Sequence, residues 1–326
     1  MRLHIYLIFM ITFPVSSLFV DAEQKVISET IKHHRDQVEK LQKYVTMFHD
    51  ALVEVSNDKE KAILANIKYE FPISNDITNA YASYDGKTNK VVIGSFISSL
   101  VYQLGISYAV SQFDSDDGSK ATTYAMYSAR LLLENTRRSK AFPKSQEPLP
   151  QKSYFHYYDV PISVRQEYFD NKRVRELIHE VYLASIFYTL THELGHHVRR
   201  HLHSKNEQST RWKEQQADNW AFEKMIELNT PTSVLHILPM IYYYVSLECL
   251  HQTKYQFARN THPGWLERYQ VYIEFFLSES KKDEKFVKQM RDKGRYDAYL
   301  QSYDVIMKTV ANQKSEFQNI YIGCEL

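Results

Sequence analysis

Residues 181–196 read VYLASIFYTLTHELGH. The apolar side chains that open this segment predict a helix buried in the protein. His192 and His196 follow four residues apart, so both imidazoles lie on one face of that helix, about one turn apart. At this spacing their nitrogens can meet a single tetrahedral Zn²⁺ ion. A buried helix does not carry histidines inward without a partner for them.

Two residues inside the motif support the same interpretation. Glu193 lies beside the histidines but points slightly aside, which suits a base acting on metal-bound water rather than a ligand. Gly195 costs about 1 kcal/mol of helix propensity, so we expect a neighbouring group to approach the backbone there. The alternative is that two histidines and a glutamate occupy the solvated face of a helix.

A candidate third ligand opens the next predicted helix, which spans about 210–228. Glu214 stands eighteen residues beyond His196, and the intervening loop lets this helix fold back toward the metal. Asp218, one turn further, could accept the spare N–H of His192 or His196 and so fix its tautomer. The residues therefore predict one Zn²⁺ per chain, bound by two histidines and Glu214.

Further histidines follow the motif at positions 197, 201 and 203. A second metal is one interpretation of His197, His201 and His203. They fall mainly on other faces of the helix, however, beside Arg199 and Arg200. We therefore expect a solvated basic helix end, which the helix dipole favours.

The remaining chain predicts a mainly helical α+β fold with a small antiparallel sheet. The segments 78–84 and 87–93 flank Asp85-Gly86, which is the signature of a hairpin with a type I′ turn. Four prolines in 140–161 predict a surface excursion or lid within the region 113–161. Helices are expected over 23–68, 94–112, 119–139 and 163–202, the last with a break near Asn171.

The first 22 residues form a predicted signal peptide. Arg2 and His4 precede an apolar run of 16 residues, and Val20-Asp-Ala22 is a suitable cleavage site. The run is short for a bilayer span of about 20 residues, although an uncleaved anchor is the alternative. We therefore expect an exported protein, periplasmic or secreted. In that oxidising compartment Cys249 and Cys324 could form a disulfide, or remain two unrelated thiols.

Composition limits the function classes. With 40 basic and 39 acidic residues, the net charge of +1 excludes nucleic-acid binding driven by overall positive charge. A mean hydropathy of −0.47 excludes a polytopic membrane protein. No apolar segment of membrane-spanning length follows residue 20, so we expect no membrane association after signal cleavage.

The spacing of the motifs resembles a known family. His192-Glu-x-x-His196 followed by Glu214-x-x-Ala-Asp218 resembles the gluzincin metallopeptidases, specifically the HtpX/CaaX-protease-like family and its soluble periplasmic relatives. Asn79-Ala-Tyr-Ala82, at the start of the hairpin, is similar to that family's Asn-Ala-x-Ala segment. Thr261-His-Pro263 with Arg268 is similar to its Thr-His-Pro…Arg segment. The resemblance covers about 70–270.

The resemblance implies a zincin-like fold in a single metallopeptidase domain over 23–326, with a helical C-terminal extension at 271–326. It assigns the zinc to His192, His196 and Glu214, with Glu193 as general base and Asp218 supporting a ligand. The protein would then be a zinc endopeptidase of protein or peptide substrates, with a role in protein quality control.

The outer motifs receive roles from the same resemblance. The hairpin would offer an edge strand to an extended peptide, with Asn79 nearby. His262 would lie close to the metal, either stabilising the oxyanion or occupying a fourth metal position. Arg268 would order this region. The region 113–161 has no counterpart in the family.

Two other functions remain open. The first is a non-proteolytic chaperone or binding protein whose zinc site is closed by a fourth protein ligand, such as His262. The second is a hydrolase of another gluzincin branch, resembling the ImmA-like or phage-exclusion peptidases. Those are intracellular regulators, so the signal segment argues against them.

Overall fold

The computed structural model describes residues 38–72, 80–114, 119–140, 149–202 and 210–228, together with 237, 239–240, 243–244 and 288. Several predicted features lie outside these residues. They are the signal segment 1–22, Asn79, both cysteines, His262, Arg268 and nearly all of 271–326.

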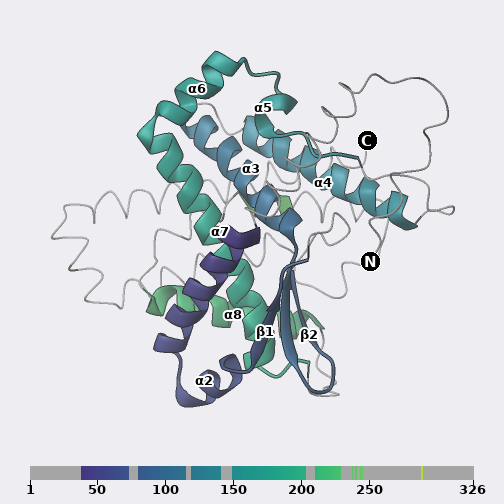
Figure 1. The fold of residues 1–326 in the computed structure, drawn as a ribbon, viewed down its shortest axis with the longest axis vertical. Helices are drawn as coiled ribbons and strands as arrows, with labels where there is room; N and C mark the ends of the chain where they lie inside the picture. Colours follow the sequence, from purple (N-terminus) through teal and green to yellow (C-terminus); the bar gives the residue numbers. More distant parts are fainter. Residues whose placement is uncertain are drawn as a thin grey trace, which may run out of the picture.

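One long helix, α7 (Lys172–Val198), runs through the centre of the molecule (Figure 1). It begins at Asn171, whose side chain accepts hydrogen bonds from the backbone N–H groups of Arg173 and Val174. The same residue ends α6 (Ile162–Asp170). The predicted break near Asn171 is therefore confirmed, and its cause is a change from one helix to an N-cap of the next.

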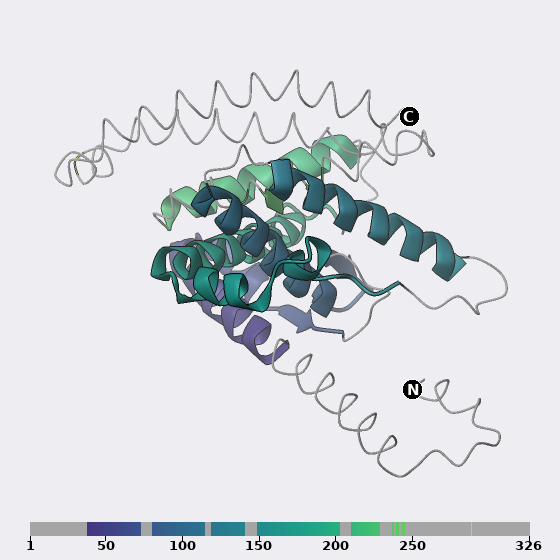
Figure 2. The same ribbon diagram turned by 90° about the horizontal axis from the view of Figure 1, so that it is seen from above.

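Helices cover both ends of α7. Its first half packs against α3 (Ser95–Phe113), and its second half packs against α8 (Thr210–Glu227). Figure 2 shows α7 between α8 and the helix over residues 38–55. Together with α4 (Ser119–Lys140), α3 and α8 confirm the predicted helices to within two residues.

A three-stranded sheet stands beside the second half of α7 (Figure 1). Its order is β1 (Ile67–Glu70), β3 (Asn89–Ile93) and β2 (Ala80–Tyr84). β2 pairs with β3 antiparallel, as predicted, whereas β1 pairs with β3 in parallel. The prediction of a purely antiparallel sheet is wrong because β1 was not foreseen: the predicted helix 23–68 included its first two residues, whereas the whole strand pairs with β3.

The hairpin turn also differs from the prediction. It spans four residues, 85–88, and within it Gly86 has a positive φ (+92°) whereas Asp85 does not. Asp85 Oδ1 accepts hydrogen bonds from the backbone N–H groups of Lys87 and Thr88. The aspartate side chain thus closes the turn itself, and a type I′ geometry with two positive φ angles is wrong.

Two apolar clusters meet along α7. The first joins the helix over 38–55, the sheet, α8 and the second half of α7. The second joins α3, α4, α5 (Tyr154–Tyr157) and the first half of α7. Buried residues at their centres include Leu41, Leu52, Ile93, Ile186, Leu190 and Trp220 in the first, and Leu104, Tyr124, Tyr154 and Val181 in the second.

The described part of the predicted excursion, 149–161, belongs to the second cluster. Tyr154 and Phe155 are buried, and Tyr124 donates a hydrogen bond to the carbonyl of Lys152. The prediction of a surface excursion therefore holds for exposed residues such as Pro150, His156 and Pro161, and it is wrong for Tyr154 and Phe155, which α5 carries into the core.

A buried ion pair fixes α8 to α2 (Asp58–Leu64). Lys224 of α8 lies 3.1 Å from Glu60 Oε2 and 2.7 Å from Glu227. Trp220 donates its indole N–H to Glu60 Oε1. Because one carboxylate is shared by two side chains of α8, the rotation of this helix about its axis is well defined.

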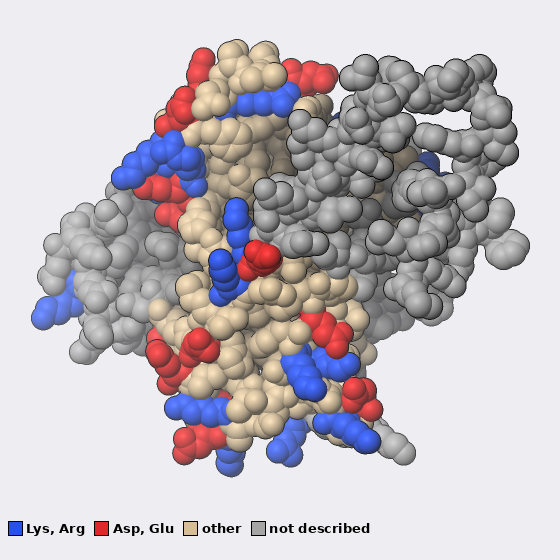
Figure 3. Space-filling view, viewed as in Figure 1, with Lys and Arg blue, Asp and Glu red and all other residues tan. Residues whose placement is uncertain are grey.

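The charge of the surface in Figure 3 is mixed, and the described helices are not of a membrane-spanning kind. Figure 3 shows basic and acidic side chains interspersed over the face it draws. Among the described residues, no helix combines the length and apolar character needed to cross a membrane.

Candidate metal centre

Three side chains converge where the second half of α7 meets α8. His192 Nε2 lies 3.2 Å from His196 Nε2 and 3.2 Å from Glu214 Oε2. His196 Nε2 lies 3.5 Å from Glu214 Oε1. His192 and Glu214 are each 9% exposed.

The dimensions of this triangle fit a metal ion. Zinc binds nitrogen and oxygen ligands at about 2.0–2.1 Å, so tetrahedral ligand atoms stand about 3.3 Å apart. The three measured separations, 3.2, 3.2 and 3.5 Å, agree with that value. Convergence of a carboxylate and two imidazole nitrogens in a buried position is favourable when a cation binds them together. The cluster is therefore a possible site for a divalent metal ion.

The close approach of α8 to α7 occurs at Gly195. A Cβ atom at this position would lie 2.9 Å from the carbonyl oxygen of Ala217 and 3.0 Å from its Cα. Only the absence of a side chain lets the two backbones approach this closely. Glu214 stands one turn before Ala217, so the contact at Gly195 brings the carboxylate to the histidines, and the predicted approach to the backbone is confirmed.

Asp218 lies behind His192. Its Oδ1 is 2.8 Å from His192 Nδ1, and Tyr188 donates its hydroxyl to the same oxygen at 2.7 Å. Because the carboxylate can accept the proton on Nδ1, Nε2 is the nitrogen left to bind a metal ion once its own proton is released. Burial opposes protonation of His192, but the hydrogen bonds with Asp218 and Glu214 outweigh it and raise its pKa to about 10.

His201 lies behind His196 in a similar way. The two Nδ1 atoms are 3.0 Å apart, and His201 is only 6% exposed. Burial, with a smaller contribution from Lys213, lowers the pKa of His201 to about 4.

The prediction of a solvated basic helix end is wrong for two of its three histidines. His197 is fully buried and donates its Nε2–H to the carbonyl of Lys90 in the sheet. His201 follows the end of α7, so helical spacing does not describe its direction. His203 lies outside the described residues.

Glu193 connects α7 to the sheet. Its Oε2 accepts a hydrogen bond of 2.7 Å from the backbone N–H of Ala82. β2 is an edge strand, and this N–H points away from β3. Since backbone direction alternates along an antiparallel strand, Ala80 and Tyr84 also turn their N–H and C=O groups to the free edge.

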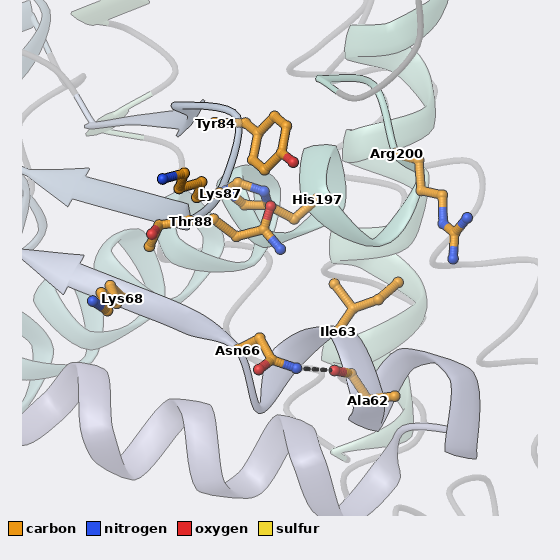
Figure 4. A pocket seen from close by; sticks show the side chains of 10 residues that line it. Ala62, Ile63, Asn66, Lys68, Tyr84, Lys87, Thr88, His197 and Arg200 are labelled. Atoms are coloured by element: carbon orange, nitrogen blue, oxygen red, sulfur yellow. Dashed lines mark hydrogen bonds between the residues drawn. The ribbon is translucent and has the colours of Figure 1, made fainter.

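A separate pocket of about 610 Å³ lies between α2, the start of β1, the hairpin turn and the end of α7 (Figure 4). Its charged lining residues are Lys68, Lys87 and Arg200, and no carboxylate lines it. None of the three converging side chains lines it either. The metal cluster and this basic pocket are thus distinct features of the described part of the chain.

Sequence reasoning brings together His192, His196, Glu214 and Asp218, and the structure places all four in one cluster. Sequence reasoning did not predict the contact of Tyr188 with Asp218 or that of His201 with His196. Tyr188 could have been found, because it stands four residues before His192 on the same helical face. His201 could not, because its position depends on a turn after the helix.

Comparison with known proteins identifies one family by its sequence pattern. The family model described as Peptidase U49 matches residues 93–289, which is more than half of the chain. The match includes all of α7 and α8, and hence the metal cluster. No curated protein and no solved structure matches this chain.

Proposed function

The chain belongs to the peptidase U49 family, and from this premise we propose that it is a zinc-dependent endopeptidase of the gluzincin type. The observation that carries the proposal is the convergence of His192, His196 and Glu214 within 4.8 Å of one another. Two histidines from one helix and a glutamate from the next are the ligand set of this class, as the HtpX/CaaX-protease-like resemblance implies.

The residues present fit the ion. His192, His196 and Glu214 would hold it, and Asp218 would keep His192 in the required tautomer. When bound, zinc supplies a Lewis acid for the scissile carbonyl and a water of lowered pKa. Three protein ligands leave a position for that water, as catalytic zinc sites require.

Glu193 would act as the general base. It immediately follows His192 on α7, and its carboxylate lies between the cluster and β2. From this position it can take a proton from the attacking water and pass it to the leaving amine. The hydrogen bond from Ala82 N–H fixes the direction of the carboxylate.

The free edge of β2 would bind the substrate. An extended peptide can add to this edge as a further strand, through the outward backbone groups of Ala80 and the outward carbonyl of Ala82, whose N–H is held by Glu193. Ala82 directly contacts the proposed base, so a peptide on this edge passes beside Glu193 and the metal ligands. Backbone recognition of this kind suits proteins and peptides as a substrate class.

The exported location stays a prediction from the signal segment 1–22. Roles for Asn79, His262 and Arg268 likewise stay predictions from the resemblance alone. A role in protein quality control in the periplasm is likewise a prediction, which depends on the exported location and on the family resemblance.

Glu193→Gln tests the mechanism. We expect the variant to bind one zinc per chain like the wild type and to cleave a peptide library about 10²–10⁴ times more slowly. Mass spectrometry of the library and metal analysis of the purified protein provide the two measurements. Glu176→Gln, the same change on the exposed face of α7, is the matched control.

Cleavage by Glu193→Gln at the wild-type rate would contradict the mechanism. A wild-type protein that binds zinc but cleaves no peptide would instead favour a binding protein with a closed zinc site.

A further inference from the structure

Helix α7 ends in a turn that normally uses glycine. The backbone N–H of Arg200 donates to the carbonyl of His197, and that of His201 donates to the carbonyl of His196, both at 2.9 Å. This pair of bonds is a Schellman motif, with Arg200 in the left-handed position at φ +57°. An L side chain adopts that conformation only at a cost in energy.

The turn folds His201 back over His196. Side chains at these two positions of a Schellman motif usually form an apolar contact. Here the contact is polar, with Nδ1 to Nδ1 at 3.0 Å and the rings edge to face. Trp212 of α8 packs against the other side of His201, with ring centroids 5.9 Å apart. The imidazole of His201 is therefore held in place by two helices.

The direction of the proton follows from the cluster. His196 Nε2 faces His192 and Glu214. When His196 binds a metal ion through this nitrogen, its imidazole carries its proton on Nδ1. His201 Nδ1 then accepts that proton, and a neutral imidazole that accepts through one nitrogen carries its own proton on the other. This other nitrogen, Nε2, is buried and meets no hydrogen-bond partner among the described residues.

We propose that His201 is a positioning residue, which accepts the Nδ1–H of His196 and fixes the orientation of this ring for the metal. Asp218 does the same for His192 from the opposite side. The proposal rests on the metal site of the proposed function, but not on peptide cleavage.

A neutral partner suits the charge of the cluster. Glu193, Glu214 and Asp218 already place three carboxylates around the cluster, which is more negative charge than one divalent cation neutralises. A further carboxylate behind His196 would add to this excess in a buried position, which is costly. An imidazole supplies the acceptor without adding charge.

Two substitutions separate the acceptor from the packing. His201→Leu keeps most of the volume but removes the acceptor, whereas His201→Asn keeps an oxygen or nitrogen at the same δ position. Zinc affinity of the full-length chain, measured by competition with a chelator, should fall about 10–100-fold in His201→Leu. It should stay within about threefold of the wild type in His201→Asn, because the amide oxygen can still accept.

His179→Leu is the matched control. It makes the same change on the exposed face of the same helix, beside Tyr44 and away from the cluster. Its zinc affinity should equal that of the wild type.

The proposal is wrong if His201→Leu binds zinc as tightly as the wild type, or if His201→Asn loses as much affinity as His201→Leu. Should His201→Leu not fold, nitrogen NMR of zinc-loaded wild-type protein decides. We expect protons on His196 Nδ1 and His201 Nε2, and a proton on His201 Nδ1 would overturn the proposal. Wild-type protein that binds no zinc would refute the proposed function itself.

Discussion

Asp218 is only 3% exposed and accepts hydrogen bonds from two side chains at a single oxygen. One donor is His192, a proposed ligand, and the other is Tyr188, which holds the carboxylate in position. A buried carboxylate with these partners controls both the tautomer and the orientation of the imidazole in front of it.

Asp218→Ala should therefore weaken zinc binding about 10–100-fold, because the Nδ1–H of His192 loses its acceptor in a buried position. Tyr188→Phe should have a much smaller effect, since the carboxylate remains. Chelator competition measures both. Equal affinities of Asp218→Ala and wild-type protein would show that this contact does not support the metal.

Individual site residues differ in how far the sequence reveals them. His192 and His196 follow from helical spacing, which is a local property. Glu214 and Asp218 follow from the length of the loop and the same spacing on the next helix. His201 depends on a left-handed backbone at Arg200, and a basic residue gives no local signal for that conformation.

At the scale of elements, the crossing of α7 and α8 depends on Gly195. A methyl group there would contact the backbone of Ala217 at 2.9–3.0 Å, which is closer than real Cβ contacts. The two helices carry different ligands of the proposed metal, so their separation and the ligand geometry are coupled.

Gly195→Ala should lower the free energy of unfolding by about 1–3 kcal/mol and weaken zinc binding, because α8 must move away. Urea denaturation and chelator competition measure the two effects. Gly86→Ala is the matched control, since its Cβ would meet nothing within 4 Å and only its positive φ is strained. It should lose stability while its zinc affinity stays unchanged, and the same result for Gly195→Ala would contradict the coupling.

The ion pair between α2 and α8 gives the stability a dependence on pH. Burial raises the pKa of Glu60, but hydrogen bonds from Trp220, Lys224 and the backbone of Asn57 outweigh it, so the folded pKa lies below 4.5. A lowered pKa contributes stability above the unfolded value, and this contribution disappears as the pH falls through the folded value.

Glu60→Gln should reduce the free energy of unfolding at pH 7 by roughly 1–3 kcal/mol and flatten its decline below about pH 4.5. Urea unfolding at a series of pH values tests this. Glu70→Gln, which removes an exposed partner of Lys90, should change little. An acid decline as steep in Glu60→Gln as in the wild type would contradict the assignment.

The sequence predicted the long helices correctly, but it did not predict the four-residue strand β1 or the geometry of the hairpin turn. α3, α4 and α8 each run for 18 residues or more without a proline. β1 has four residues, and it is a strand because it pairs with β3, which is a tertiary contact. The four-residue hairpin turn depends on the side chain of Asp85, so the residue pair alone suggested the wrong turn type.

At the scale of the whole molecule, a metal ion in the cluster would join α7 to α8. Any ligand that binds only the folded state stabilises it, by about 2.7 kcal/mol at one hundred times its dissociation constant. The same ion would connect the first apolar cluster across its two main helices.

Removal of zinc by a chelator should therefore lower the melting temperature by roughly 5–10 °C, and added zinc should restore it. Differential scanning calorimetry measures the shift. Glu214→Ala should show a much smaller shift, because it lacks one ligand. A wild-type melting temperature unaffected by the chelator would contradict a metal that bridges the helices.

The residues of the proposed site lie far apart along the chain, which affects when the site can form during synthesis. Ala82 contacts Glu193 across 111 residues, and Glu214 follows His192 by a further 22. At 5–20 residues per second, roughly 6–22 s pass between synthesis of the hairpin and synthesis of the base that it touches. Closing so long a loop is also entropically costly. The proposed peptidase site therefore cannot assemble on a growing chain until translation has passed α8.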